Sequence, residues 1–408
     1  MIRLAIVGVG GYGWGPIREL GAASESLGCR LIAAADTRLQ DLPERVEWLQ
    51  DRSVRLYEDA VKMFEDLRGR CEGVYIASSI PSHAPLTVAA ARCGFHVLLE
   101  KPPAATVQEV DDMLTALDRA RRMCLVGFQA MHGHLRLVLD SLAAGRLGRV
   151  ESLTCAAGWP RTREYYRRND WAGRLRLGER WVLDGPVTNA LAHQLAHMLA
   201  MASGRANALA EPVSVRAELY AAGPFDSHNL AAIEVRTAEG PVVRFFCSHA
   251  TQGQFGPVID VTADGGRAAY AHGKQSRVTC ADGTAETRPA EPTETRNMLA
   301  NFLDALRADD PSLLRCPLAE TRKYVTALDA AHDSSGCVHR IDERYWHLVD
   351  AGTDSERVVV DGLDDVLTAA NERGELFSEL PDAPAWAVAP EAFDVDEYRE
   401  FPRRFRCQ

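Results

Sequence analysis

Arg3-Leu-Ala-Ile-Val7 runs directly into Gly8-Val-Gly10-Gly-Tyr-Gly13, and this stretch decides the fold of the N-terminal half. An apolar strand that leads into G-x-G-x-x-G opens a dinucleotide-binding β-α-β unit. Gly8 allows the tight turn, Gly10 lets the backbone approach a pyrophosphate, and Gly13 lets the helix pack closely on the strand. The N-terminus of the following helix offers free N–H groups to the phosphates.

A second apolar run, residues 30–35, ends at Asp36, 23 residues after Gly13. A carboxylate at this position accepts hydrogen bonds from both ribose hydroxyls and repels a 2′-phosphate, which favours NAD over NADP. Arg38 follows closely and could hold that phosphate, so NADP stays open. The alternative interpretation is a tight turn beside a solvated Asp.

Further apolar runs at 73–77, 96–99 and 124–128 alternate with helical patterns at 85–93 and 106–121. The first of these helices is expected to begin near Pro85. Near-continuous apolar strands separated by helices predict a parallel sheet covered on both faces. The sequence therefore predicts an α/β fold class, with a doubly wound Rossmann domain over residues 1–128.

The second half has a different pattern. β-rich runs at 150–157 and within 213–280 predict a large, mostly antiparallel open sheet, accompanied by helices. We expect an α+β substrate and oligomerisation domain over 129–340 and a C-terminal extension over 341–408 that packs on the core. Because an open sheet face can pair two subunits, a homodimer or homotetramer is expected. The helices are predicted at 186–203, 293–308, 317–334 and 362–371, and a last strand at 358–360.

Composition excludes several classes of protein. The 408 residues carry a net charge of −11, which gives no general attraction to nucleic acid or anionic membranes. No apolar run reaches the roughly 18 residues of a transmembrane helix, and the N-terminus lacks a signal peptide, so we expect a cytoplasmic protein. The ten cysteines form no Cys-x-x-Cys pair and are expected to be reduced and mostly buried.

Lysine is rare in this chain. Only four of the 46 basic residues are Lys, and one of them stands in Glu100-Lys101-Pro102-Pro103, directly after the fourth apolar run. Ligands of doubly wound sheets bind at the carboxyl ends of the strands. Lysine is a compact donor that can lose its proton, whereas arginine effectively cannot. A functional role for Lys101 is therefore favoured over that of a solvated strand-end residue.

The chain resembles the glucose-fructose oxidoreductase / inositol dehydrogenase (Gfo/Idh/MocA) family of NAD(P)-dependent oxidoreductases. The resemblance rests on the glycine motif, Ile76-Ala-Ser-Ser-Ile-Pro-Ser-His83, Glu100-Lys-Pro102 and Gly127-Phe-Gln129. It implies that Lys101 hydrogen-bonds the reacting oxygen and that Gln129 lies near the nicotinamide. Met131 stands where this family often has Arg, so no substrate role is assigned there. The cofactor-binding residues expected are Gly8, Gly10, Gly11, Tyr12, Gly13, Asp36, Thr37, Arg38, Ser78, Ser79, Pro81, His83, Glu100, Lys101 and Gln129.

A stripe of polar residues marks the helix predicted after Gly185. Asn189, His193 and His197 recur every four residues, so Asn189 and His193 are expected to touch. Oxidation of a secondary alcohol needs a base near neutrality, and histidine provides one. In the resembling family this helix carries an Asp and, four residues on, the catalytic His. Asn189 replaces the Asp, and His193 matches the His. The catalytic residues expected are Lys101, His193 and Asn189.

Two further alternatives concern this region. His193-x-x-x-His197 could hold a metal, but Gln194 stands where a metalloprotease motif has Glu, so no metal is expected. Between Trp159 and Trp171 the chain mixes aromatic and basic residues, which fits a loop that covers substrate or, alternatively, a surface loop with buried aromatics. The substrate-binding residues expected are Lys101, Trp159, Arg163, Tyr166, Trp171, Asn189 and His193.

These patterns lead to one functional hypothesis and two alternatives. The hypothesis is hydride transfer between NAD, with NADP as the alternative cofactor, and a secondary hydroxyl or ketone of a sugar, cyclitol or related polyhydroxy compound. In the first alternative, tightly bound NAD is recycled in a net non-redox sugar reaction. In the second, the chain is a non-catalytic dinucleotide-binding sensor, which the replacement of Asp by Asn189 leaves open.

Overall fold

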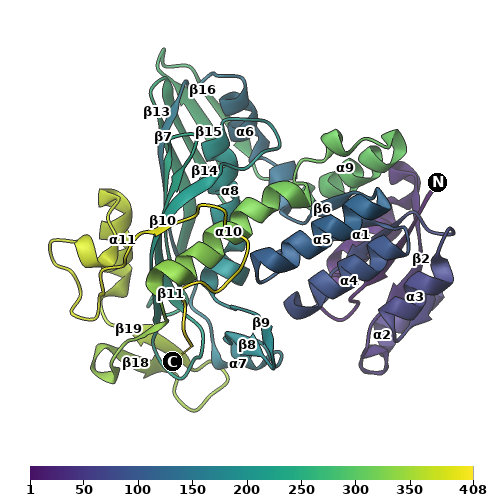
Figure 1. Cartoon of the computed structure of the whole chain (residues 1–408), viewed down its shortest axis with the longest axis horizontal. Helices are drawn as coiled ribbons and strands as arrows, with labels where there is room; N and C mark the ends of the chain where they lie inside the picture. The colour runs from purple at the N-terminus through teal and green to yellow at the C-terminus, as the bar shows by residue number, and fades with distance from the viewer. Residues whose placement is uncertain (408) are drawn as a thin grey trace. The chain divides into compact units, whose positions relative to one another are not determined.

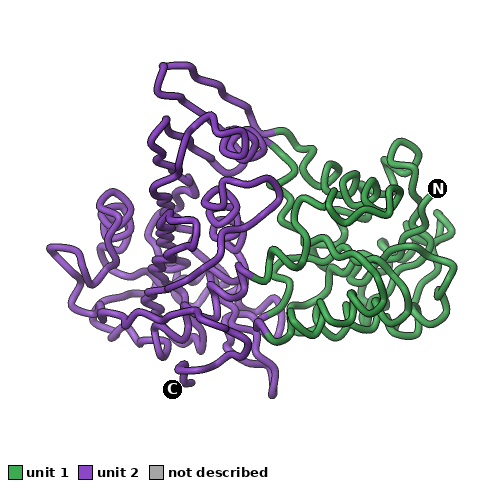
Figure 2. The backbone as a smooth tube through the Cα atoms, turned by 45° about the horizontal axis from the view of Figure 1, so that its top comes forward, with its two compact units in different colours: residues 1–104, 108–133, 291–322 green, residues 105–107, 134–290, 323–408 purple. Residues whose placement is uncertain are grey.

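The computed structural model describes residues 1–407 and divides the chain into two compact units. The first contains residues 1–104, 108–133 and 291–322, and the second contains residues 105–107, 134–290 and the chain from 323 onward (Figure 2). Residues 291–322, which the sequence pattern assigns to the second domain, lie in the first unit. Helix α9 (Glu294–Ala308) packs there against α1 (Trp14–Leu27).

The first unit is built on a six-stranded sheet in which every strand pair is parallel. Its strand order, β3-β2-β1-β4-β5-β6, is that of the dinucleotide-binding fold. The doubly wound sheet predicted from the apolar runs is therefore confirmed. The strands are β1 (Ile2–Val7), β2 (Cys29–Ala35), β3 (Arg55–Tyr57), β4 (Gly73–Ile76), β5 (His96–Leu99) and β6 (Cys124–Val126).

Helices connect these strands (Figure 1). The remaining helices of the unit are α2 (Pro43–Gln50), α3 (Ala60–Leu67), α4 (Ile80–Arg92) and α5 (Val107–Ala120). The expected start of α4 near Pro85 is wrong, because the helix begins at Ile80 with Pro81 in its first turn. Pro81 is favourable there because a first-turn N–H has no intrahelical partner, so Pro81 marks the start and Pro85 is an exposed interior position. In α1, Pro16 lies in the first turn, as its missing N–H requires.

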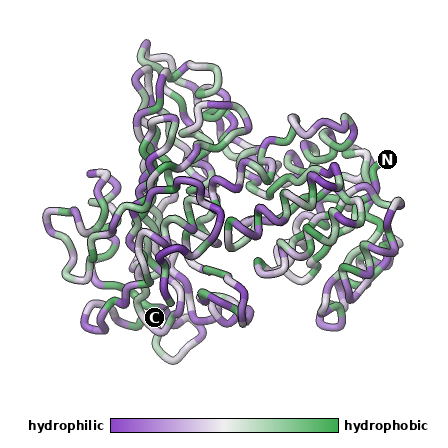
Figure 3. The backbone as a smooth tube through the Cα atoms, in the orientation of Figure 1, coloured by the Kyte–Doolittle hydropathy of each residue, from purple (hydrophilic) through white to green (hydrophobic). Residues whose placement is uncertain are grey.

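The second unit is built on a ten-stranded sheet, and most of its strand pairs are antiparallel, as predicted. The exceptions are the central pair of β7 with β12 and the edge pair of β10 with β17, which are parallel. Hydrophobic residues recur along the strands of this sheet (Figure 3). The strands are β7 (Val150–Gly158), β10 (Pro212–Ala221), β11 (Leu230–Thr237), β12 (Val242–Ser248), β13 (Phe255–Ala263), β14 (Gly266–Ala271), β15 (Gln275–Cys280), β16 (Ala285–Pro289), β17 (His339–Arg340) and β20 (Phe393–Asp394).

Helices α8 and α11 pack on opposite faces of this sheet (Figure 1). Side chains of β12 alternate between the two faces of the sheet. Phe246 packs in a buried cluster with residues of α11, and Phe245 points to the opposite face. The helices of the unit are α6 (Arg136–Ala143), α7 (Arg163–Arg167), α8 (Ala192–Ser203), α10 (Leu318–Ser335) and α11 (Leu363–Arg373). Short elements complete the chain: β8 (Arg176–Leu177), β9 (Arg180–Trp181), β18 (Trp346–Val349), β19 (Arg357–Val360), η1 (Leu39–Asp41), η2 (Gln129–His132), η3 (Pro186–Ala190), η4 (Pro311–Leu313), η5 (Glu343–Tyr345) and η6 (Phe377–Glu379).

The C-terminal extension packs on the sheet face formed by β10, β11 and β12. Leu363, Leu367 and Phe377 lie in one buried cluster with Tyr220 and Phe246 of the strands. The extension therefore completes the core of the second unit.

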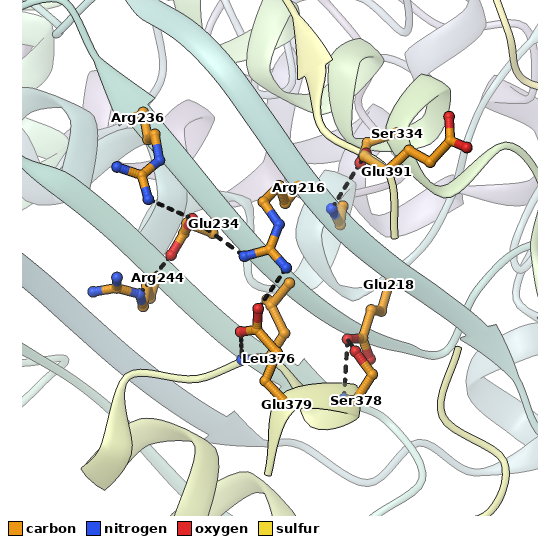
Figure 4. A network of polar contacts seen from close by, with 11 residues as sticks. Arg216, Glu218, Glu234, Arg236, Arg244, Ser334, Leu376, Ser378, Glu379 and Glu391 are labelled. Atoms are coloured by element: carbon orange, nitrogen blue, oxygen red, sulfur yellow. Dashed lines mark hydrogen bonds and ion pairs between the residues drawn. The ribbon is translucent and has the colours of Figure 1, made fainter. Parts of the chain in front are cut away.

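Polar contacts attach the extension beside that cluster (Figure 4). Arg216 of β10 pairs with Glu379 at 2.5 Å. The Ser378 hydroxyl donates to Glu218 at 2.6 Å. Arg244 pairs with the buried carboxylate of Glu234 at 2.8 Å.

No helix among residues 1–407 is both long and apolar enough to cross a membrane. Seven of the ten cysteines are buried: Cys29, Cys71, Cys93, Cys124, Cys155, Cys247 and Cys316.

Candidate functional site

The glycine loop after β1 fits a phosphate cradle. Gly8 has φ +96, and a Cβ there would lie 2.3 Å from the Ala77 carbonyl oxygen beyond β4. A Cβ on Gly13 would lie 2.2 Å from the Gly8 carbonyl oxygen. Only glycine therefore allows the loop to fold this closely against the end of β4, with the N-terminus of α1 behind it.

Asp36 ends β2 and faces the same loop. Its Oδ2 accepts hydrogen bonds from the backbone N–H of Val9 at 2.7 Å and of Gly10 at 2.9 Å, and its Oδ1 accepts one from Arg38 N–H at 3.0 Å. A carboxylate offers about four acceptor positions, so these three bonds leave capacity for a ribose hydroxyl. Asp36 thus orders the loop and remains suited to a dinucleotide ribose.

The predicted cofactor residues follow the carboxyl ends of five parallel strands. The glycine loop follows β1, Asp36 follows β2, the segment 78–83 follows β4, Glu100 follows β5, and Gln129 follows β6. Because these strands are parallel, their carboxyl ends meet at one edge of the sheet. At this edge Gly11, Tyr12, Thr37, Arg38 and Ser79 are exposed.

Glu100 is a buried carboxyl group that contacts the backbone of Lys101 and two other side chains. Its Oε1 accepts hydrogen bonds from the Tyr75 hydroxyl and from Gln129 Nε2, the latter at 3.0 Å, while its Oε2 accepts one from the Lys101 backbone N–H at 3.3 Å. Burial raises the pKa of Glu100 to about 7. The Lys101–Pro102 peptide bond is cis. The backbone N–H of Lys101 therefore donates to a buried carboxyl group whose pKa is raised to about 7.

His83 lies behind this edge. Its Nδ1 is 2.8 Å from the Pro102 carbonyl oxygen, and its Nε2 is 3.1 Å from the Ser78 carbonyl oxygen. Burial lowers the pKa of His83, so the ring is neutral and donates to only one of the two carbonyls. His83 thus lies between the segments that follow β4 and β5 and contacts both of them. Its direct contact with a cofactor stays a prediction.

In the second unit, the helix predicted over 186–203 is interrupted. Residues 186–190 form the π-helical turn η3, Leu191 has φ −112, and α8 begins at Ala192. Asn189 and His193 therefore do not lie on one regular helix, and the regular four-residue spacing expected between them is wrong. The helix does end at Gly204, which has φ +60.

A buried carboxylate contacts Asn189. Asn189 Nδ2 donates to Asp184 Oδ1 at 2.8 Å, and the other oxygen of Asp184 accepts from the Gly173 backbone N–H at 2.7 Å. The sequence does not predict this contact, because five residues separate Asp184 from Asn189 and no helical spacing relates them. A buried carboxylate therefore lies within hydrogen-bond distance of the Asn189 side chain.

A group of aromatic and histidine rings adjoins His193. The His193 and His197 ring centroids are 5.5 Å apart, and the ring of Tyr270 is 5.5 Å from His197. The Tyr270 hydroxyl lies 3.2 Å from His272 Nδ1. Burial, with His272 and His134 nearby, holds the pKa of His197 well below its usual value, so His197 is a neutral neighbour. Among residues 1–407 no three His, Cys, Asp or Glu side chains are grouped to hold a metal.

The predicted substrate residues of segment 159–171 divide into two groups. Trp159 lies 6.0 Å from His272, ring to ring, and so joins the histidine group. Arg163 instead pairs with Glu356 of the extension at 3.8 Å, and Tyr166 packs on Phe225 at 4.2 Å. Trp171 lies beneath the Arg168 guanidinium at 5.2 Å. Lys101 lies in the first unit, whereas His193 and Asn189 lie in the second.

Comparison with known proteins identifies the first domain. Residues 2–128 match the family model described as "Oxidoreductase family, NAD-binding Rossmann fold" (GFO_IDH_MocA), which confirms the resemblance and the expectation of NAD. An inositol 2-dehydrogenase of Azotobacter vinelandii is 26% identical over 199 residues, 48% of this chain and 52% of that protein. A glycosyl hydrolase family 109 protein of Solibacter usitatus is 26% identical over 157 residues, 36% of this chain and 35% of that protein. The chain thus spans about half or less of the length of the curated relatives it matches.

The similarity of fold extends over more of the chain. The structure of the WlbA dehydrogenase from Bordetella pertussis in complex with NADH and UDP-GlcNAcA superposes with a TM-score of 0.66. The match covers 82% of this chain and 96% of that one at 22% sequence identity. A likeness at this identity establishes the fold of both units.

Proposed function

We propose that this chain, whose residues 2–128 belong to the Gfo/Idh/MocA oxidoreductase family, transfers hydride between NAD and a secondary hydroxyl or ketone of a sugar, cyclitol or related polyhydroxy compound. The observation that carries the proposal is Lys101, which follows β5 at the edge where the glycine loop fits a dinucleotide. The relatives named inositol 2-dehydrogenase and the dehydrogenase solved with NADH and UDP-GlcNAcA support a sugar-like substrate.

Each proposed residue has a defined task. Bound NAD supplies the hydride-accepting nicotinamide. Lys101 hydrogen-bonds the reacting oxygen and stabilises the negative charge that develops on it as its proton leaves. His193 receives that proton as the general base, since a histidine titrates near neutrality. Asn189, held by Asp184 at 2.8 Å, positions the imidazole or hydrogen-bonds the substrate.

The first test is a turnover assay with NAD or NADP and a panel of sugars, cyclitols and uronic acids, followed by absorbance of the reduced nicotinamide. We expect Lys101→Ala and His193→Ala to bind NAD as tightly as the unchanged protein in calorimetry and to lose at least about 100-fold in kcat. Exposed Lys62→Ala serves as the control and should retain full activity.

Other outcomes would redirect the proposal. Substantial turnover in both variants would refute the catalytic assignment. Tight NAD binding with no reduced nicotinamide would favour one of the alternatives. Sugar product without net reduction would then indicate a recycled cofactor, and the absence of any product would indicate a sensor.

A further inference from the structure

Segment 159–171 holds a row of alternating aromatic rings and guanidinium groups. The Arg161 guanidinium carbon lies 5.3 Å from the ring centroid of Trp159 and 4.8 Å from that of Tyr165. The Arg168 guanidinium carbon lies 3.6 Å from the same Tyr165 centroid and 5.2 Å from that of Trp171. Two positive charges are thereby held over the faces of three rings, an arrangement that restrains both side chains.

Neither of these arginines is neutralised by an ion pair among residues 1–407. Their neighbours on α7 are paired with the C-terminal extension, Arg163 with Glu356 at 3.8 Å and Arg167 with Asp354 at 4.0 Å. Arg161 Nε is buried and has no hydrogen-bond partner in the described part of the chain. Because no described carboxylate offsets its charge, the Arg161 guanidinium is suited to an anion supplied by a ligand.

The row adjoins the histidine group of the same unit through Trp159, whose ring lies 6.0 Å from that of His272, and it also contacts His249. The His249 ring lies 5.9 Å from Tyr165, and its Nδ1 lies 2.9 Å from the Trp159 carbonyl oxygen. Burial, with Arg161 as the next cause, lowers the pKa of His249 to about 3, so this ring is neutral at pH 7. The positive charge beside His249 therefore comes from Arg161 and Arg168.

We propose that Arg161 and Arg168 form an anion subsite that binds a carboxylate or phosphate group carried by the substrate. A guanidinium group presents parallel N–H donors that match the oxygens of either anion. The flanking Trp159 and Trp171 offer ring faces to the apolar side of a sugar. This inference rests on the proposed function and narrows its substrate class to acidic sugars, either uronates or sugar phosphates.

The test measures binding before turnover. D-glucuronate, D-glucose 6-phosphate and D-glucose are titrated by calorimetry into the NAD-loaded full chain. We expect one of the two acidic sugars to bind at least about 10-fold more tightly than glucose at low salt, and its identity distinguishes carboxylate from phosphate. Arg161→Gln and Arg168→Gln should each remove most of that preference and leave glucose affinity unchanged. Arg167→Gln, which changes the exposed arginine next to Arg168 that is paired with Asp354, is the matched control and should keep the preference.

Several results would overturn the subsite. These are equal affinity for charged and neutral sugars, no binding of either acid at millimolar concentration, or an equal loss for acidic and neutral sugars in the two variants. If Arg161→Gln fails to fold, the exposed Arg168→Gln and the salt dependence of binding decide the matter. Arg161→Lys, which keeps the charge but loses the planar fork, should be intermediate.

The two proposals fail in different ways. Acid-selective binding without any reduced nicotinamide would leave the subsite standing and remove the oxidoreductase assignment. Turnover of neutral sugars that is insensitive to Arg161 and Arg168 would leave the oxidoreductase standing and remove the subsite.

Discussion

Glu100 connects three parts of the nucleotide edge through one buried carboxyl group. Its oxygens accept hydrogen bonds from Tyr75 and Gln129, which belong to other segments of the sheet, and from the Lys101 backbone. Because water is excluded, the charged form of Glu100 is disfavoured relative to an exposed glutamate. The folded chain therefore takes up a proton at Glu100 at a pH where the unfolded chain has released it.

This uptake has a measurable effect on stability. With the pKa raised from 4.5 to about 7, the contribution of Glu100 is fully present below pH 4.5 and is lost as the pH rises through about 7. The loss is at most about 3 kcal/mol. We expect Glu100→Gln to remove this part of the pH dependence, measured as the difference in unfolding midpoint between pH 5 and pH 8. A variant as pH-sensitive as the unchanged protein would contradict the assignment.

Asp184 gives a second prediction. In Asn189→Asp, a second carboxylate would lie within hydrogen-bond distance of Asp184, and two such charges cannot both ionise at the ordinary pKa of about 4. We expect the pH–rate profile of Asn189→Asp to show an additional pKa above about 4. The double variant Asp184→Asn/Asn189→Asp has a single carboxylate again and should lose it. An Asn189→Asp profile identical to that of the unchanged protein would show that this contact is not coupled to catalysis.

The sequence identified those site residues that belong to a local pattern. The glycine loop and Asp36 follow from their spacing, and Lys101 from its position after a strand and its rarity. No sequence pattern identifies Asp184, Arg161 and Arg168 as site residues, because their partners depend on how a long irregular segment folds. Four neighbouring arginines, at 161, 163, 167 and 168, look alike in sequence, and the ion pairs of Arg163 with Glu356 and of Arg167 with Asp354 set two of them apart.

At the scale of elements, the β1–α1 connection offers a test of the cradle. Gly13→Ala would place a Cβ 2.2 Å from the Gly8 carbonyl oxygen, so we expect the loop to shift and NAD affinity to fall by at least about 10-fold. Gly15→Ala, two residues later in α1, meets nothing within 4 Å and should stabilise the helix by up to about 1 kcal/mol without loss of NAD. Calorimetric titration of both variants with NAD compares them directly. Equal affinities would refute the cradle.

The helices and strands were predicted correctly where the hydrophobic periodicity of the sequence was clear. Apolar runs gave the strands of the parallel sheet, and glycines marked the ends of helices at Gly94 and Gly204. The short elements β3, α2 and α3 were missed because each has eight residues or fewer and a mixed pattern. The turn at η3 was missed because its residues satisfy a helical spacing. In the structure the Thr188 hydroxyl accepts a hydrogen bond from the Gly185 backbone N–H, and Asp184 accepts one from the Asn189 side chain.

At the scale of the whole molecule, the extension contributes to the core of the second unit. Phe377 is fully buried among residues of the sheet, and we expect Phe377→Ala to cost about 3–5 kcal/mol in the free energy of unfolding. Leu348 of the same extension is 43% exposed, so Leu348→Ala should change it by no more than about 0.5 kcal/mol. Denaturant unfolding of the full chain measures both. Similar losses in the two variants would mean that the extension is not packed as described.

The extension also restricts how copies of the chain can associate. We predict a homodimer or homotetramer that uses the large sheet, and α11 already covers part of β7 and β12. The uncovered face of β13 presents Val258, which is 38% exposed, together with Asp260 and Thr262. Sedimentation of Val258→Arg should show a smaller species than the unchanged protein. A monomer in both cases would refute assembly through the sheet.

The pairing of β10 has a consequence for how the protein behaves at high concentration. Its outer side is bonded to β17 at Tyr220–Ala221 and to β20 at Ser214–Val215, both from the chain's own C-terminal part. One rim of the sheet therefore ends in the two-residue strands β17 and β20, and the other ends at β16 (Ala285–Pro289), where Glu286, Arg288 and Pro289 discourage strand addition. Very short strands at one rim and charged residues with a proline at the other disfavour edge-to-edge addition of further copies at high concentration.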